Sequence, residues 1–261
     1  MGHRAKAPPD RCRTAEKRRV IPSEQEKPLA AIEEIGVSQI LDGMDREGFW
    51  VSPPLVDAHA CTQLANLYED GEETFRSTIN MARYGFGSGE YKYFCAPLPA
   101  KVQQLREKLY ERLAPIANEW SIRRGEVPEW PSDHEELRAR CAAAGQSRPT
   151  PLLLRYRSGD FNCLHQDLYG AIHFPLQGIL LLDRPGVDFE GGELLLVEQR
   201  PRKQAKAMVV PITQCAIAVI PVRERPVPGA RGMALIKVRH GVSPLRGGLR
   251  RTLGLIFHDA A

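Results

Sequence analysis

The sequence predicts an α+β protein, with helices in its first part and an antiparallel β sandwich or barrel in its second. Residues 100–122 place apolar side chains three and four positions apart, which is the spacing of one helix face. After Pro151 the chain changes to seven short apolar runs separated by glycine and proline. Short runs with turn signals between them are typical of an antiparallel sandwich or barrel.

Three segments follow from these patterns. Residues 1–29 are rich in proline and charged residues, so we expect a disordered basic tail. Residues 30–149 should form a helical flank packed on the barrel, and residues 150–261 the β core. In the flank, helices are expected at 56–68, 100–122 and 133–144, the last starting at a Ser132 or Asp133 cap and ending at Gly145. In the core, strands are expected at 152–157, 171–182, 193–197, 207–212, 216–222, 234–238 and 252–257.

Composition narrows the class of protein. Of 261 residues, 43% are hydrophobic and 26% charged, which is ordinary for a soluble globular chain. No apolar run approaches the roughly 18 residues of a membrane span, and the N-terminus does not resemble a secretory signal. Six cysteines lie far apart without a C-x-x-C pair. We therefore expect reduced thiols, a cytoplasmic location and no membrane partner.

Charge is segregated along the chain. The net charge is +4, yet residues 200–251 hold twelve basic side chains and a single acidic one, Glu224. Such a region can attract an anionic partner, either a nucleic acid or a small dicarboxylate. Solvated strand faces and loops would give the same composition, so both interpretations stay open.

Two histidines and one aspartate have the spacing of a metal site. His165 and Asp167 are two residues apart, so in a strand both side chains point to the same face. His240 closes a later apolar run and can supply a third ligand from a distant strand. Two imidazoles and one carboxylate leave coordination positions open, as an iron that binds a co-substrate and dioxygen requires.

An anion site follows His240 in the sequence. Arg250 and Thr252 are two residues apart at the start of the last expected strand, so both can face the barrel interior. A guanidinium matches a carboxylate with two parallel hydrogen bonds, and the hydroxyl could add a third. The alternative is that Arg250 and Arg251 flank a strand in solvent.

These residues resemble the Fe(II)- and 2-oxoglutarate-dependent oxygenase superfamily, and most closely its prolyl-hydroxylase-like branch. The resemblance covers about 110 residues with the elements in the family's order. It runs through Tyr156-Arg157-Ser158-Gly159, His165-x-Asp167, Gly191-Gly192-Glu193-Leu194, His240-x-Val242-x-Pro244 and Arg250-x-Thr252.

The resemblance implies a double-stranded β-helix core, a jelly-roll of the cupin-like type, and a catalytic iron held by His165, Asp167 and His240. It implies that Arg250 binds the distal carboxylate of 2-oxoglutarate, with Thr252 beside it. Tyr156 falls where the family often places a tyrosine that contacts the co-substrate, although a packing role is equally open. The reaction implied consumes 2-oxoglutarate and O2, releases succinate and hydroxylates a C–H bond. Arg251 departs from the family pattern, which has a bulky apolar residue there.

The flank is similar to that of a bacterial subgroup described as prolyl-hydroxylase-like or as acting on damaged DNA. Residues 75–94 carry this likeness. They include aromatic rings that could stack on a base, and glycines that could make a mobile lid; the rings could equally be core. The substrate residues predicted from this segment and the following β region are Arg83, Tyr84, Tyr91, Tyr93 and His173.

Three functions remain open from the sequence. The first is oxidative demethylation of alkylated nucleic acid, which the basic region and the aromatic segment favour. The alternative is a peptidyl-prolyl hydroxylase, which fits the core resemblance. The third is a non-catalytic binding module on the same barrel, against which the intact ligand set argues.

Overall fold

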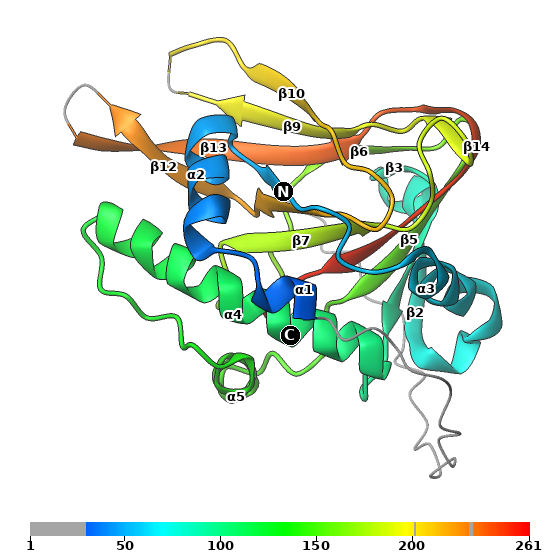
Figure 1. Cartoon of the computed structure of the whole chain (residues 1–261), viewed down its shortest axis with the longest axis horizontal. Coiled ribbons are helices and arrows are strands. Elements are labelled where there is room, and N and C mark those ends of the chain that lie inside the picture. The colour runs from blue at the N-terminus through cyan, green and yellow to red at the C-terminus, as the bar shows by residue number, and fades with distance from the viewer. Residues whose placement is uncertain (1–29, 201, 230–231) are drawn as a thin grey trace.

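Two antiparallel sheets form the centre of the molecule (Figure 1). The computed structural model describes residues 30–200, 202–229 and 232–261, so the predicted tail lies outside it. The larger sheet has the order β1-β11-β7-β14-β5-β4-β2, with β8 pairing β14. Its strands are β1 (Trp50–Val51), β2 (Phe75–Asn80), β4 (Glu90–Phe94), β5 (Leu152–Arg157), β7 (Leu176–Leu181), β8 (Phe189–Gly191), β11 (Ile217–Pro221) and β14 (Leu245–Leu255).

The smaller sheet has the order β10-β9-β13-β6-β3, with β12 pairing β13. Apolar residues of β7, β9, β11 and β13 share one buried cluster, so the two sheets face each other across it. This is the architecture expected of a double-stranded β-helix, and the predicted fold class is confirmed. The strands of this sheet are β3 (Gly87–Ser88), β6 (Phe161–His165), β9 (Leu194–Gln199), β10 (Lys206–Val210), β12 (Glu224–Gly229) and β13 (Gly232–Val242).

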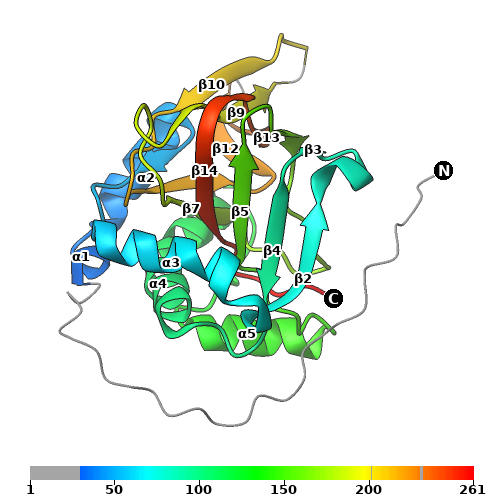
Figure 2. The same cartoon turned by 90° about the vertical axis from the view of Figure 1, so that its right-hand side faces the viewer.

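Helices cover the outer face of the larger sheet and leave the outer side of β9, β10 and β13 uncovered within the described residues (Figures 1 and 2). The longest helix buries the apolar face that the sequence predicts, and Leu109 on that face approaches β7. A Cβ at Gly178 would lie 2.6 Å from the Leu109 side chain, so glycine permits this close packing. The helices are α1 (Ala30–Glu33), α2 (Val37–Glu47), α3 (Ala58–Asp70), α4 (Ala100–Arg123) and α5 (His134–Ala143), with 3-10 turns at Glu72–Thr74 and Met81–Tyr84.

Most predicted elements are present, with two differences. The strand expected at 171–182 begins only at Leu176, so residues 171–175 were wrongly included; Pro175 has no N–H to give to a sheet. The segment 30–149 contains strands as well as helices. Within it, β2 and β4 pair with each other, and β4 pairs with β5, which extends the larger sheet.

The cysteines differ from the expectation of reduced thiols at one position. Cys95 is disulfide-bonded, so the prediction is wrong there. Cys61, Cys141, Cys163 and Cys215 are free. The cytoplasmic location that rested on reduced thiols therefore stays a prediction. None of the described helices is both long and apolar enough to cross a membrane.

Candidate metal centre

The pairing of β6 with β13 brings the three predicted metal ligands together. His165 ends β6, and its Cα partner across the sheet is His240 on β13. Their ring centroids lie 4.2 Å apart, and Asp167 follows two residues after the strand ends. One donor atom from each of the three side chains lies within 4.8 Å of the others, which is the size of a mononuclear metal site.

Hydrogen bonds orient His165 for metal binding. Its Nδ1 lies 2.8 Å from the carbonyl oxygen of Cys163, and only a protonated Nδ1 can donate to that acceptor. The lone pair therefore stays on Nε2, which lies 3.6 Å from Asp167 Oδ1. Burial, followed by the neighbouring His240, lowers the pKa of His165. Both effects favour the neutral imidazole that a metal ion needs.

Asp167 has its own supporting side chains. The Tyr169 hydroxyl donates to Asp167 Oδ1 over 2.7 Å, and the Tyr93 hydroxyl donates to Tyr169 over 3.0 Å. Asp167 Oδ2 lies 3.3 Å from His240 Nε2. Burial opposes ionisation, but His240, His165 and the Tyr169 hydroxyl together hold the pKa of Asp167 well below its usual range. The group is therefore a carboxylate, as a metal ligand must be.

The sequence interpretation did not include Tyr169. Burial and the nearby Asp167 raise the pKa of its hydroxyl far above the ordinary value, so it stays a phenol that can donate. The signal available in the sequence was its position two residues after Asp167. That spacing is informative only when the path of the chain beyond the strand end is known.

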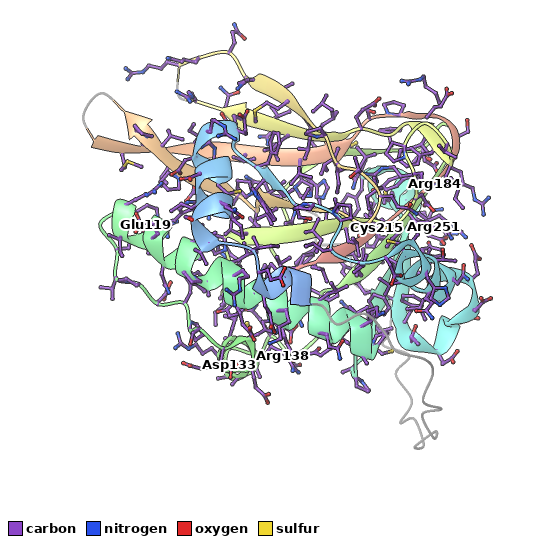
Figure 3. The ribbon with its side chains drawn as sticks, in the orientation of Figure 1. Glu119, Asp133, Arg138, Arg184, Cys215 and Arg251 are labelled. Atoms are coloured by element: carbon purple, nitrogen blue, oxygen red, sulfur yellow. The ribbon has the colours of Figure 1, made fainter. Side chains whose placement is uncertain are left out.

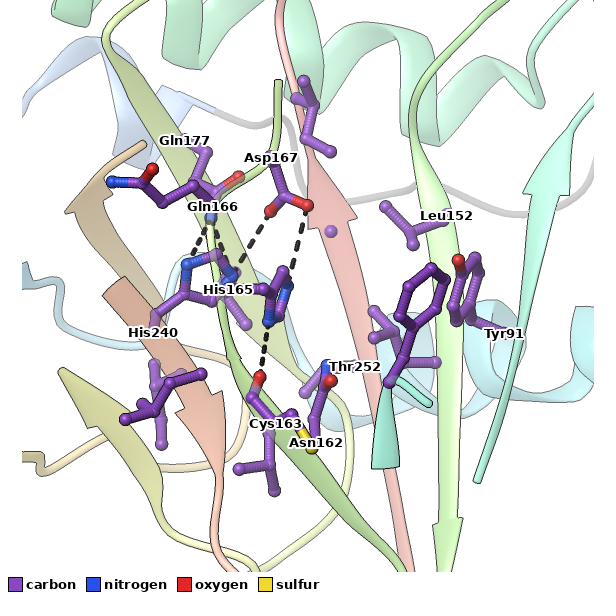
Figure 4. A pocket seen from close by; sticks show the side chains of 18 of the residues that line it. Tyr91, Leu152, Asn162, Cys163, His165, Gln166, Asp167, Gln177, His240 and Thr252 are labelled. Atoms are coloured by element: carbon purple, nitrogen blue, oxygen red, sulfur yellow. Dashed lines mark hydrogen bonds and ion pairs between the residues drawn. The ribbon is translucent and has the colours of Figure 1, made fainter. Parts of the chain in front are cut away.

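A cavity of about 330 Å³ opens beside the three ligands (Figure 4). It is enclosed by strands of both sheets, and Phe86 and Leu164 in its wall are exposed to solvent. Eight predicted site residues line it: Tyr91, Tyr93, Tyr156, His165, Asp167, His240, Arg250 and Thr252.

Arg250 is a buried cation without a partner. Its exposed fraction is 1%, its Nε makes no hydrogen bond, and no carboxylate within the described residues forms an ion pair with it. Its neighbours are the rings of Tyr156 and Phe189, at 5.6 and 5.9 Å from the guanidinium carbon. Burial lowers the pKa of Arg250, yet an arginine side chain stays charged in proteins. An isolated buried charge is costly, so this position requires an anion.

The strands around Arg250 determine what such an anion would meet. Arg250 and Thr252 lie on the same face of β14, and the Cα partner of Arg250 on β5 is Tyr156. The Tyr156 hydroxyl accepts a hydrogen bond from Asn162 Nδ2 over 3.2 Å. A side chain at Gly192 would collide with Leu245 and come within 3.0 Å of Arg250 Cδ, so glycine there gives the arginine its space. The cavity therefore offers a carboxylate a cation and a hydroxyl together.

The remaining predicted residues lie outside the cavity wall. Tyr84 is exposed and stacks on Phe86, with centroids 5.6 Å apart and planes inclined by 20°. Arg83 and His173 do not line the cavity. Arg251 forms a two-pronged ion pair with Asp183 on the outer side of the sheet (Figure 3). Its charge is neutralised there and does not enter the cavity.

The donor set fits ferrous iron. Two neutral imidazoles and one carboxylate on one side of a cavity form the arrangement that leaves coordination positions free for other ligands. His165, Asp167 and His240 would hold the ion, and Tyr169 and the Cys163 carbonyl would orient two of these ligands.

Comparisons with known proteins identify relatives of this chain. A family model described as "Oxygenase, catalysing oxidative methylation of damaged DNA" matches residues 89–260. Two uncharacterized proteins of Mycobacterium tuberculosis, MT2286 and Rv2227, are each 46% identical over 168 residues, which is 64% of this chain and 72% of each relative.

Solved structures share the fold. An oxidoreductase of the 2OG-Fe(II) oxygenase family from Burkholderia pseudomallei superposes with a TM-score of 0.52 and 14% identity, over 87% of this chain and 94% of that one. A prolyl 4-hydroxylase from Phytophthora capsici superposes with a TM-score of 0.50 and 15% identity, over 92% and 68%. At these identities the likeness concerns the fold.

Proposed function

Because the chain belongs to the family of oxygenases described as catalysing oxidative methylation of damaged DNA, we propose that it is an Fe(II)- and 2-oxoglutarate-dependent dioxygenase acting on alkylated nucleic acid. The observation that carries this proposal is Arg250, a buried cation without a partner that lines the same cavity as two histidines and a carboxylate. A small dicarboxylate can reach the cation with one end and the metal ligands with the other.

Each residue has a distinct task in this proposal. His165, Asp167 and His240 hold the iron, which when bound supplies the activation of dioxygen that is coupled to oxidative decarboxylation of 2-oxoglutarate. Arg250 binds the distal carboxylate of 2-oxoglutarate through its guanidinium, and the Thr252 hydroxyl and Tyr156 complete that end of the pocket. The apolar side chains Leu154, Ile179 and Leu194 in the wall exclude water from the reacting groups.

The rim of the cavity supports a planar substrate. Tyr84 and Phe86 form a stacked pair of exposed rings, and Phe86 also lines the cavity. Three other exposed apolar side chains belong to the adjoining segment, namely Phe161, Leu164 and Leu168. Exposed flat rings beside a catalytic cavity suit a nucleobase, because every base has a π-face on which an aromatic ring can stack.

The smaller sheet supports an anionic polymer as the substrate. Along β13, Ile236, Val238 and His240 are buried, whereas Lys237 and Arg239 between them are exposed on the uncovered face. Neither basic side chain has an ion-pair partner in the part of the chain that the structure describes. Because β13 is bonded to β6, these charges lie on the sheet that also carries His165, where they can bind phosphates.

The proposed chemistry is hydroxylation of an N-methyl group, which then leaves as formaldehyde. Tyr91 and Tyr93 would contact the substrate from the cavity wall. Contacts of Arg83 and His173 with the substrate stay predictions. A peptidyl-prolyl substrate is the alternative, since a prolyl 4-hydroxylase is among the chains that share this fold.

A succinate-release assay separates the two substrates. Purified protein with Fe(II), ascorbate and 2-oxoglutarate is incubated with N-methylated oligonucleotides, or with proline-containing peptides. The matched controls are the unmethylated oligonucleotides and the same peptides with alanine for proline. We expect succinate and formaldehyde with the methylated oligonucleotides alone. A gain of one oxygen on the peptides, with no formaldehyde from the oligonucleotides, would replace our substrate by the alternative.

The rim is tested in the same assay. Phe86→Ala should lower formaldehyde release from the methylated oligonucleotide by roughly tenfold, because one stacked base is worth about 1–3 kcal/mol. Val187→Ala is the control, since Val187 is also exposed but does not line the cavity. Equal rates for the two variants would remove the rim from the substrate site.

A further inference from the structure

Gln177 lies against one of the proposed metal ligands. It is on β7, its exposed fraction is 2%, and it lines the cavity within an otherwise apolar strand. Its Nε2 lies 3.2 Å from His240 Nε2 and 3.5 Å from His240 Nδ1 (Figure 4). Its Oε1 is buried and has no hydrogen-bond partner. A buried polar group with an unpaired acceptor calls for a functional explanation.

The state of His240 at a metal site conflicts with this amide orientation. A neutral imidazole has one N–H and one lone pair, and the metal takes the lone pair. His240 Nε2 faces Asp167 Oδ2 at 3.3 Å, so Nε2 is the coordinating atom and Nδ1 carries the hydrogen. That N–H would then point at the NH2 group of Gln177, which places one donor against another.

Rotating the amide of Gln177 by half a turn removes both difficulties. The rotation exchanges Oε1 and Nε2, which diffraction itself seldom distinguishes. The unpaired acceptor would then face the N–H of His240, and the donor conflict would disappear. The other two ligands already have partners of this kind, the Cys163 carbonyl for His165 and the Tyr169 hydroxyl for Asp167.

We propose that Gln177 is the positioning residue of His240, with its amide oxygen accepting the imidazole N–H and leaving Nε2 free for the metal. This inference rests on the proposed metal centre. It assigns to Gln177 a role in metal affinity rather than in contact with the substrate. Partners of this kind hold both the tautomer and the direction of a ligating imidazole, and losing one typically weakens metal binding 10- to 100-fold.

The test is a titration of the full chain with Co(II), followed by its visible absorption, without 2-oxoglutarate or substrate. Gln177→Leu should bind Co(II) about 10- to 100-fold more weakly than the unaltered protein. Gln177→Glu keeps an acceptor oxygen and should bind within a few-fold of it. The control is Gln214→Leu, which removes a different amide, one bonded to the Leu182 carbonyl, and should not change Co(II) binding.

The outcomes separate this inference from the proposed function. If the unaltered protein itself binds no Co(II), the metal centre and the proposed function fall together. If it binds Co(II) and Gln177→Leu binds equally well, only the role of Gln177 is refuted. If Gln177→Leu and Gln177→Glu lose the same affinity, the oxygen is not what matters and the inference is again refuted. Thermal unfolding of each variant shows whether it is folded at the titration temperature.

Discussion

Arg106 and Arg250 are both fully buried arginines, yet their surroundings differ completely. Arg106 on α4 donates to the carbonyl oxygens of Ile256 and Phe257 and to Thr150, and it pairs with Asp259 at 2.7 Å. Arg250 on β14 has aromatic rings beside it and no acceptor for its Nε. A buried charge whose hydrogen bonds are satisfied within the fold stabilises that fold. One that lacks them indicates a bound anion.

The largest expected effect concerns the satisfied arginine. Arg106→Met should lower the free energy of unfolding by about 3–5 kcal/mol, because it leaves Asp259 buried without its main partner. Urea denaturation followed by circular dichroism measures this change. A loss below about 1 kcal/mol would show that the network around Arg106 does not stabilise the fold as described.

The unsatisfied arginine should behave in the opposite way. Arg250→Met should leave the free energy of unfolding unchanged within about 1 kcal/mol or raise it, because it removes an unpaired buried charge. The 2-oxoglutarate concentration for half-maximal succinate formation should rise about 100-fold or more. Arg251→Met is the matched control, since that neighbouring side chain pairs with Asp183 outside the cavity and should leave the requirement nearly unchanged. The same requirement in all three proteins would place the anion site elsewhere.

A smaller effect is expected at Tyr169. Tyr169→Phe removes the hydrogen bond to Asp167 and should weaken Co(II) binding by about tenfold. Tyr110→Phe is the comparison, because it also removes a buried phenol, one that donates to the Pro131 carbonyl far from the metal ligands. If both variants bind Co(II) like the unaltered protein, Tyr169 contributes packing alone.

The smallest effect is a pH dependence near Arg106. Burial, with the charge of Arg106, lowers the pKa values of His134 and His258 to about 3. In the unfolded chain these groups take up protons near their ordinary value of 6.5. Their contribution to stability is therefore complete well above pH 6.5 and is lost progressively as pH falls from there towards 3. Between pH 7 and 6 each histidine should cost less than about 1 kcal/mol.

This dependence can be measured by urea denaturation at several pH values. His134→Gln, which keeps a donor for the Phe257 carbonyl, should flatten the fall in stability on acidification. An equally steep fall in the variant would assign the dependence to other groups.

Local patterns in the sequence were sufficient for much of the fold. Residues 152–157 form the strand expected of them, and the helix expected at 100–122 runs from Ala100 to Arg123. Both elements depend on periodicity within a few turns or residues. The pairing of β4 with β5 could not be predicted in this way, because it joins segments about 60 residues apart and neither segment encodes its partner.

The site was predictable to a similar extent. The approach of His165, Asp167 and His240 agrees with their spacing, and Arg250 and Thr252 share a face as alternation requires. The supporting residues Tyr169 and Gln177 were missed, because their contacts depend on a loop path and on β7 lying across the cavity. The role of Arg106 was hidden for the same reason, since its acceptors lie about 150 residues further along the chain.

The central claim is that one cavity holds both an iron ion and 2-oxoglutarate. It is tested most directly by Fe(II)-dependent succinate formation from 2-oxoglutarate in the unaltered protein and in Asp167→Ala. The account predicts succinate only when Fe(II) and 2-oxoglutarate are both supplied, and none above background with Asp167→Ala. Undiminished succinate formation by Asp167→Ala would contradict it.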